Sequence, residues 1–501
     1  MATETREPGL TMPKTSRNRA VMLATFLLAL VLAGCDTLDF TEVTNPNTTT
    51  DDLAEAAEPT RALLPGVRAQ MARGVRAVVQ TTDMVSDNFE IAFTNIGGEL
   101  SDPYALNPEG PSFNSTGGIG AYWNLQELRA LGDFLIDSIA PQDDNSTDQQ
   151  LAEAHFYRGM AFLMQGENFA GVPTGADRDP TPAAELLTLA LDDFTTTTNL
   201  VDPAGAPAGL SVAALAALAR THRALGNAGE ARTFAQQALA QDADFAWLQG
   251  YAASEIENPF PNDTRAFQPL PRLDFLDPKY VERDSPIPVV KAEEMHLILA
   301  EVAMSEGDYA AAAEEIRSAV LLAETRPRAS FTDQDNRGNP DLTIRPRDAE
   351  VLVRADADSP YRAGLVLTRP GSVTVPAISG TSLDADSVAA LSVPEEVRHA
   401  FWLARQEMLF LEGRRLNDLG VLMPVMQREI DASPAISNGD DVTRPVIPSY
   451  IPEDVMDRFL PRSPYVDERN GGELATDQIT IAVDMNRILA VEGVSKFGTL
   501  P

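Results

Sequence analysis

One stretch of the sequence brings charged side chains together at a spacing that suggests chemistry. Five charged residues lie within or just after a helix predicted over residues 395–416: Glu407, Glu412, Arg414, Arg415 and Asp418. Paired carboxylates can act as a general acid and a general base. Glu407, Arg414 and Asp418 are, however, seven and four residues apart, so they share one helical face on which opposite charges form ion pairs. We therefore interpret the cluster as structural, with Glu407 and Glu412 held by neighbouring arginines.

The other polar motifs do not have the spacing of a catalytic or metal site. The four histidines lie on predicted helices and lack the His-Glu-x-x-His spacing of a zinc site. Residues 333–338, Asp-Gln-Asp-Asn-Arg-Gly, resemble the start of a calcium loop, but the twelfth position is Ile344 instead of Glu. The sequence has neither a nucleotide-binding loop nor a Gly-x-Ser-x-Gly motif. It therefore predicts no metal site, no cofactor and no enzyme activity.

The single cysteine has a specific context near the N-terminus. Arg17 and Arg19 precede the run 20–33, which is apolar except for Thr25 and leads into Leu-Ala-Gly-Cys ending at Cys35. This order is typical of a bacterial lipoprotein signal, and the run is shorter than the ~20 residues of a membrane-spanning helix. The thiol of Cys35 would accept a diacylglycerol, and acyl chains would anchor the protein to a membrane.

These features predict three parts of the chain. Residues 1–34 form a lipoprotein signal peptide, and residues 35–52, with an Asn-Pro-Asn and a Thr run, form a tether. Residues 53–501 form the folded domain.

The composition supports a folded body and argues against one class of partner. The 501 residues are 44% hydrophobic, which is enough for a core. The chain has 39 Lys and Arg against 74 Asp and Glu, a formal charge of −35, whereas binding to phosphates requires clustered positive charge. We therefore expect no nucleic-acid partner. The lysines number four in the whole sequence: Lys14, Lys279, Lys291 and Lys496.

Hydrophobic periodicity and turn residues predict a helical protein. The predicted helices cover residues 53–82, 121–139, 148–169, 183–198, 211–225, 228–241, 290–305, 308–325, 395–416 and 453–459. Long stretches between them, rich in proline or glycine, are expected to be irregular: 87–119, 243–289, 326–393 and 431–470. Since no run of alternating strand residues stands out, α/β folds are disfavoured.

Two helix pairs resemble tetratricopeptide repeats. A small residue lies seven positions before a turn glycine in each, at Ala219 and Gly226 and again at Ala300 and Gly307. The two pairs are 81 residues apart in the sequence, so we do not expect a continuous solenoid. The predicted fold class is all-α, with tetratricopeptide-like helix pairs decorated with long irregular loops.

Several longer stretches resemble the SusD/RagB family of nutrient-binding proteins. Residues 153–173, from Glu-Ala-His-Phe-Tyr-Arg-Gly to Phe-Ala-Gly-Val-Pro, resemble the family pattern EA-x-F-x-RA-x-x-Y…FG-x-VP. Residues 405–419 resemble R-x-E-L-x-F-E-G-x-R-x-x-D-L, with an extra residue at Leu411. Residues 286–301 are similar to a third family segment, with Lys291 in place of the usual Arg. The matches follow the family's order, and the chain is identified as a divergent SusD/RagB-like member.

The resemblance implies a function and a partner. A SusD-like protein is a non-catalytic lipoprotein of the outer membrane, lipid-anchored and facing the cell exterior. It captures an oligosaccharide or a peptide and delivers it to a SusC-like TonB-dependent transporter. Two alternatives remain: a tetratricopeptide-like scaffold that binds proteins, and a surface hydrolase with a nucleophile or carboxylate pair in a cleft.

Ligand contacts are expected from aromatic and amide side chains in the irregular stretches, because aromatic rings offer flat apolar faces to sugars. The candidate ligand-binding residues are Tyr104, Phe113, Asn114, Trp247, Tyr251 and Phe260. We expect the stretches 87–119 and 243–289 to form one shared binding face. Trp123 and Trp402 lie on predicted helices and are expected to pack in the core.

Overall fold

A computed structural model gives the structure of the chain. It describes residues 57–90, 103–109, 120–175, 178–205, 207–263, 268–269, 271–332, 350–354, 362–366, 372–453, 459–460, 476–481 and 483–501. All of these belong to one unit, Ala57–Pro501. The predicted lipidation site Cys35, the tether, and the stretch 333–338 lie outside the described residues.

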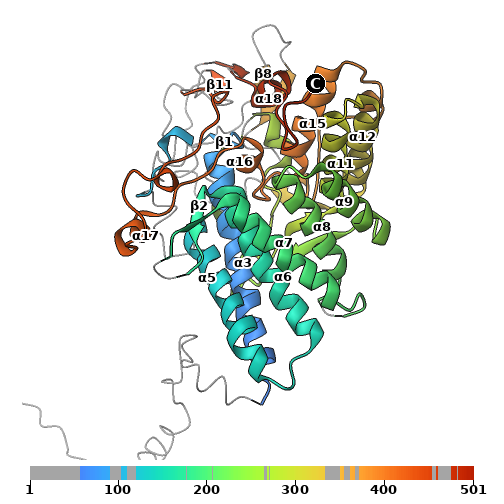
Figure 1. Ribbon diagram of the computed structural model, residues 1–501. Coiled ribbons are helices and arrows are strands. Elements are labelled where there is room, and N and C mark those ends of the chain that lie inside the picture. Colours follow the sequence, from blue (N-terminus) through green and yellow to red (C-terminus); the bar gives the residue numbers. More distant parts are fainter. Residues whose placement is uncertain are drawn as a thin grey trace, which may run out of the picture. The chain divides into compact units, whose positions relative to one another are not determined.

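The described part of this unit is built mostly of α-helices (Figure 1). The long ones are α3 (Pro59–Val85), α5 (Ala121–Asp133), α6 (Asp148–Asn168), α7 (Ala183–Leu200), α8 (Leu210–Ala224), α9 (Ala228–Gln241), α11 (Ala292–Ser305), α12 (Tyr309–Thr325) and α15 (Pro394–Met408). The short ones are α10 (Phe260–Asp263), α14 (Ala385–Ala389), α16 (Arg415–Asp418), α17 (Gln427–Ala432) and α18 (Met485–Val491). Six-residue π-helix η3 (Phe134–Ile139) continues α5 to the end predicted for it.

The two predicted tetratricopeptide-like pairs are confirmed as α8–α9 and α11–α12. Gly226 and Gly307 each follow the first helix of a pair with φ of 79° and 78°. Glycine has no Cβ and adopts this left-handed conformation without strain, so the chain reverses there into the second helix. Small residues such as Ala219 and Ala300 are fully buried between the helices.

The helix pairs form one continuous array, contrary to the expectation from their separation in sequence. Helices α6, α7, α8 and α9 pack each against the next, and α11 packs against both α9 and α8. The insertion between α9 and α11 begins and ends at neighbouring positions of the array. Its ends are joined by β4 (Ala246–Gln249) and β6 (Ile287–Lys291), which pair antiparallel. The insertion therefore does not separate the two pairs.

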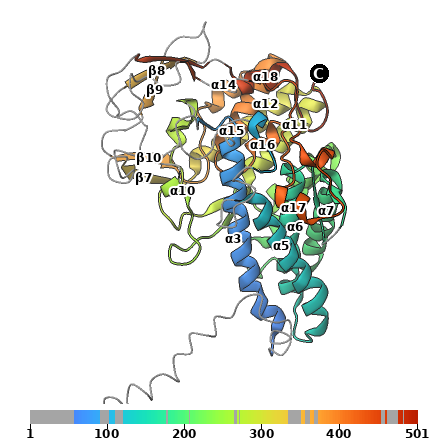
Figure 2. The ribbon, with the colours of Figure 1, turned by 90° about the vertical axis from the view of Figure 1, so that its left-hand side faces the viewer.

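The stretch 326–393 is only partly irregular, because it contains strands that the sequence analysis missed. Strand β7 (Arg328–Thr332) pairs antiparallel with β10 (Ser372–Pro376). A second sheet has the order β11-β12-β8-β9, from β8 (Glu350–Arg354), β9 (Arg362–Val366), β11 (Phe459–Leu460) and β12 (Gln478–Ile481). Figure 2 shows these strands at the top left, beside the helices.

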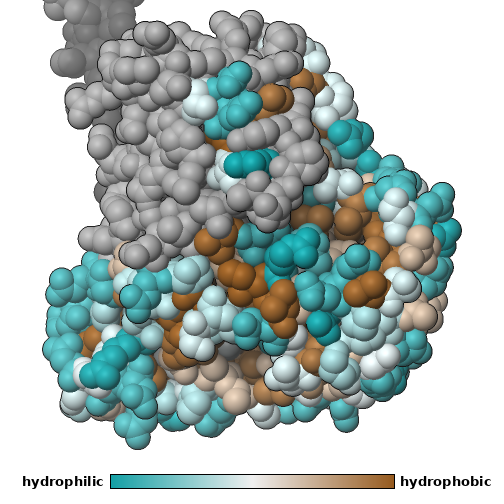
Figure 3. All heavy atoms as spheres, turned by 90° about the horizontal axis from the view of Figure 1, so that it is seen from above, coloured by the Kyte–Doolittle hydropathy of each residue, from teal (hydrophilic) through white to brown (hydrophobic). Residues whose placement is uncertain are grey.

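The buried hydrophobic residues form one core that runs through the helix array to α15 and α18. Trp402 on α15 is fully buried, as predicted for it. Helix α15 packs against α11, α12 and α18, so the C-terminal helices complete the array. From above, Figure 3 shows hydrophobic side chains gathered in the middle of the described surface and hydrophilic ones around them. Among the described residues, no helix is both long enough and apolar enough to cross a membrane.

The contact between α6 and α7 depends on a glycine. A Cβ added at Gly166 would lie 2.7 Å from Cγ of Leu187 and 3.0 Å from the carbonyl oxygen of Ala183. We expect Gly166→Ala to lower the free energy of unfolding by about 1–3 kcal/mol, since the helices must move apart. Gly229→Ala on α9 is the control, because no atom lies within 4 Å of its added Cβ. It should raise stability by about 0.5–1 kcal/mol through helix propensity. Denaturant unfolding measures both, and equal effects would contradict the close packing.

Candidate functional site

The charged cluster near residue 410 was the first candidate for chemistry, and its backbone differs from the prediction. Helix α15 ends at Met408 and does not continue to residue 416. A tight turn follows, in which Leu411 and Gly413 have φ of 54° and 74°. The carboxylate of Asp83 on α3 accepts hydrogen bonds from the backbone N–H groups of Leu411, at 3.1 Å, and Gly413, at 3.2 Å. Burial raises the pKa of Asp83 to about 6.

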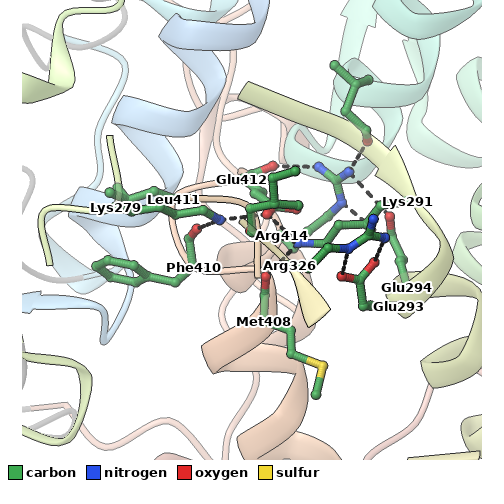
Figure 4. A network of polar contacts seen from close by, with 12 residues as sticks. Lys279, Lys291, Glu293, Glu294, Arg326, Met408, Phe410, Leu411, Glu412 and Arg414 are labelled. Carbon is green, nitrogen blue, oxygen red and sulfur yellow. Dashed lines mark hydrogen bonds and ion pairs between the residues drawn. The ribbon is translucent and has the colours of Figure 1, made fainter. Parts of the chain in front are cut away.

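Glu412 is bound by two lysines in the centre of this turn (Figure 4). Its Oε1 lies 2.6 Å from Nζ of Lys279 and 2.5 Å from Nζ of Lys291. The same ammonium groups donate to the carbonyl oxygens of Phe410, at 2.6 Å, and Met408, at 2.7 Å. Burial lowers the pKa of Lys279 to about 8. The two lysines thus hold both the carboxylate and the backbone of the turn.

A ring of buried arginine–carboxylate pairs surrounds the turn. Arg405 forms two 2.9 Å hydrogen bonds with Asp418, and Arg415 forms two of 2.5 Å with Asp87. Arg414 donates to Glu294 at 3.0 Å. Burial opposes ionisation of the carboxylates, but the adjacent arginines lower the pKa of Asp418 to about 2.

The structural interpretation of the cluster is confirmed, but the expected partners are wrong. Glu412 is held by lysines. Glu407 accepts hydrogen bonds from the hydroxyls of Thr381, at 2.7 Å, and Ser382, at 2.6 Å. Each of these carboxylates is buried and already bonded. None is placed to act on a substrate.

The histidines take part in packing and in contacts with carboxylates. His155 lies 2.7 Å from Asp193, and His296 lies 2.7 Å from Glu315. The ring of His222 stacks on Phe234. Within the described residues, no group of three His, Cys, Asp or Glu side chains could hold a metal ion.

Two of the predicted ligand-binding residues lie in the interior, and a third, Tyr251, is half-buried. Trp247 is on strand β4, 8% exposed, and its ring centroid is 4.9 Å from that of Phe156. The hydroxyl of Tyr251 donates to the carbonyl oxygen of Ala72 at 3.0 Å. Phe260 on α10 is buried against Tyr280. The assignment of Trp247 and Phe260 to exposed loops is therefore wrong, and both rings are core residues.

Of the remaining predicted ligand-binding residues, Tyr104 has an exposed aromatic ring. Tyr104, in the 3-10 turn η2 (Pro103–Ala105), is 40% exposed, and its hydroxyl donates to the carbonyl oxygen of Ile451 at 2.8 Å. Phe113 and Asn114 lie outside the described residues. The stretches 87–119 and 243–289 do meet, because β1 (Phe89–Glu90) pairs antiparallel with β5 (Gln268–Pro269), and their role as a shared binding face stays a prediction.

Trp123 is an exposed aromatic residue that the sequence analysis placed in the core. It lies on the first turn of α5 and is 39% exposed, whereas its neighbour Tyr122 is buried. The guanidinium of Arg428, on α17, lies over the indole ring at 5.6 Å from its centroid. The sequence indicated this exposure. Trp123 lies on the same helix face as the charged residue Glu127, four residues later, which is also exposed.

Hydrogen bonds connect the segments that carry Trp123 and Tyr104. We call this region the Trp123 face, and it consists of Tyr104, Trp123, Arg428 and the β2–β3 hairpin. The backbone N–H of Gln427 on α17 donates to the carbonyl oxygen of Pro108 at 2.8 Å, so α17 contacts the segment that carries Tyr104. The hairpin consists of β2 (Gly171–Pro173) and β3 (Pro180–Pro182). On α5, Gln126 donates to the carbonyl oxygen of Pro173 at 2.8 Å, which holds the hairpin next to Trp123.

The hairpin carries an open polar hollow of about 500 Å³. Its lining residues are Thr174, Arg178, Asp179, Pro180, Thr181, Pro182 and Glu185. Hydroxyl and charged groups in an open hollow can bond the hydroxyls of a sugar, and an exposed indole can stack on its ring. The Trp123 face therefore has the chemistry of a site for a polar ligand with a flat apolar side.

The buried turn gives a test of the structural interpretation. Glu412→Ala leaves two buried ammonium groups without their carboxylate, so we expect the free energy of unfolding to fall by about 3–5 kcal/mol. The control is Glu314→Ala, which removes an exposed partner of Arg317 and should change stability by less than about 1 kcal/mol. Denaturant unfolding compares the two variants. A Glu412→Ala protein as stable as the wild type would refute the structural role.

No protein family model and no curated protein matches the chain. Its structure is similar to that of a candidate sugar binding protein from Bacteroides vulgatus, with a TM-score of 0.50 and 16% identity over 76% of this chain and 98% of that one. It is also similar to a SusD superfamily protein from Bacteroides fragilis, with a TM-score of 0.48 and 14% identity over 75% of this chain and 98% of that one. For a laminarin binding SusD-like protein the TM-score is 0.48, with 11% identity over 76% and 98%. The chain therefore shares the fold of the candidate sugar binding protein, and its mostly helical architecture is the fold class that the sequence predicts.

Proposed function

We propose that this protein is a divergent SusD/RagB-like lipoprotein that captures an oligosaccharide at the cell surface without chemical conversion. The observation that carries the proposal is Trp123, a large aromatic ring left 39% exposed on α5, the helix that also holds the hairpin with the open polar hollow. Stacking of a sugar ring on such a platform gives affinity, and nearby polar groups give orientation. The fold shared with a candidate sugar binding protein supports the same class of ligand.

The proposal includes a cellular arrangement inferred from the sequence. Residues 1–34 act as a signal peptide, Cys35 carries the acyl chains, and residues 35–52 form a tether for the domain 53–501. The domain then lies at the outer membrane facing the exterior. Its partner there is a SusC-like TonB-dependent transporter, to which the bound oligosaccharide is delivered.

The buried charges favour binding over catalysis. The carboxylates that resembled an acid–base pair are enclosed and bonded to lysines, arginines or hydroxyls. The other alternative, a scaffold that binds only proteins, gives no reason for an exposed indole next to a polar hollow. A glycan array with the purified domain separates these functions, because a scaffold or a hydrolase would not retain an intact oligosaccharide on this face.

The platform predicts a binding defect without a folding defect. Trp123→Ala should weaken affinity for the oligosaccharide found on the array by about tenfold or more, since a stacked aromatic ring contributes about 1–3 kcal/mol. Its melting temperature should stay near that of the wild type. Leu321→Ala on α12 is the matched control, because this side chain is also 39% exposed and helix α12 lies on the opposite side of the helix array from α5 (Figure 1). Titration calorimetry gives the affinities. Equal binding by all three proteins would place the ligand elsewhere.

The anchor predicts a change of location. Cys35→Ser removes the only thiol of the chain, so acylation should stop and the protein should leave the membrane fraction. Thr37→Ser, two residues later, is the control and should keep the label. Labelling with a radioactive fatty acid and fractionation after a carbonate wash follow both variants. Retention of a Cys35→Ser protein in washed membranes would contradict the lipoprotein assignment.

A further inference from the structure

The arginines of this acidic protein are almost all bonded. Among the arginines whose side chains the structure describes, nearly every guanidinium contacts a carboxylate, a carbonyl or a side-chain amide or hydroxyl. The exceptions within the described residues are Arg178, Arg428 and Arg444, whose exposed side chains make no hydrogen bond or ion pair. Because the chain has 74 acidic and only 39 basic residues, each guanidinium is expected to find a carboxylate, and an unpaired one needs an explanation.

The three unpaired arginines lie on segments that contact one another. Arg178 is in the β2–β3 hairpin, Arg428 is on α17, and Arg444 follows the 3-10 turn η7 (Asp441–Thr443). The backbone N–H of Val425, just before α17, donates to the carbonyl oxygen of Val442 in η7 at 2.8 Å. The side chain of Val442 lies against Gly171 at the start of β2. All three segments therefore adjoin the Trp123 face.

The nearby carboxylates do not neutralise Arg428. Glu429 faces Tyr122 and Arg129, and its burial there raises its pKa. Asp431 accepts a 2.9 Å hydrogen bond from the side-chain amide of Gln427. The guanidinium of Arg428 therefore keeps its donors free while it lies over the indole of Trp123. A planar guanidinium binds a carboxylate through two parallel hydrogen bonds.

We propose that the Trp123 face binds an acidic oligosaccharide, and that Arg428 selects it by binding the carboxylate of a uronic acid that packs against the exposed part of Trp123. This inference rests on the proposed function and names its ligand class. Asp179 and Glu185 line the hollow together with Arg178, so sugar hydroxyls fit there and the charged group is assigned to Arg428. The protein's overall charge of −35 acts on the ligand only from short range, because salt near 0.1 M screens charges beyond about 10 Å.

The test compares trigalacturonate with its methyl ester, which keeps the sugar and removes the charge. Titration calorimetry on the full domain should show that the free acid binds about tenfold more tightly than the ester. Arg428→Gln should abolish this preference, because the affinity for the free acid should fall to about that of the ester. Arg428→Lys keeps the charge without the planar fork and should restore part of the preference. Arg317→Gln, an exposed arginine on α12, is the control and should behave as the wild type.

The outcomes separate this inference from the proposed function. Equal affinity for acid and ester, or binding on the array to neutral glycans alone, would overturn the inference and leave the function standing. A preference for the acid that survives in Arg428→Gln would overturn the role of Arg428. Failure to bind any glycan would overturn both. Binding of poly-aspartate in place of trigalacturonate would assign the face to an acidic peptide and also overturn the inference.

Discussion

The contact between Glu412 and two lysines is the interaction on which the rest of the structure depends. A carboxylate and two ammonium groups would each be costly to bury alone, and together they compensate much of that cost only at close range. Lys279 comes from the insertion between the helix pairs, Lys291 ends β6, and Glu412 follows α15. Asp83 adds α3 through the backbone of the same turn. Three distant parts of the sequence, at Asp83, at residues 279–291 and at Glu412, therefore meet at one point.

This buried junction explains how a helix array can support a binding face made of short segments. Once the turn after α15 is fixed, the chain that follows it is placed as well, with Val421, Met423 and Val425 fully buried. The backbone N–H of Met423 donates to the carbonyl oxygen of Asn168 at 2.7 Å, which joins that chain to the end of α6. Helix α17 and the β2–β3 hairpin then meet α5 around Trp123. The charged side chains of the helical frame are paired with one another, which holds the frame together. A few arginines at the Trp123 face are unpaired and can therefore bind a ligand.

Local sequence patterns were enough to predict most of the frame. The α8–α9 and α11–α12 pairs followed from small residues and turn glycines, which act within one helix pair. The end of α15 could not be predicted in this way, because the helical period continues past Met408. What ends the helix is a set of partners, Asp83, Lys279 and Lys291, that lie more than 100 residues away. The motif residues were recognised, but their partners come from the fold.

Two tryptophans show the limits of predicting the site from sequence: Trp123 was expected in the core and Trp247 in an irregular loop. The burial of Trp123 could have been judged locally, since its helical face also carries Glu127. Trp247 could not, because a tryptophan in a proline-rich stretch gives no sign that its strand pairs with another 40 residues later. Arg428 carries no sequence signal, and its importance emerges from the pairing of the other arginines.

The bonding of the lysine side chains within the fold has a practical consequence. Lys279 and Lys291 are enclosed in the junction, and the Nζ of Lys496 donates to the carbonyl oxygen of Asn417 at 2.8 Å. Every lysine side chain in the described part of the chain is thus engaged within the fold. Reagents that acylate primary amines will react slowly with the native domain and rapidly with the unfolded one. Mass spectrometry of amine acylation at these three positions would therefore report the opening of the core itself, undisturbed by reactions at the surface.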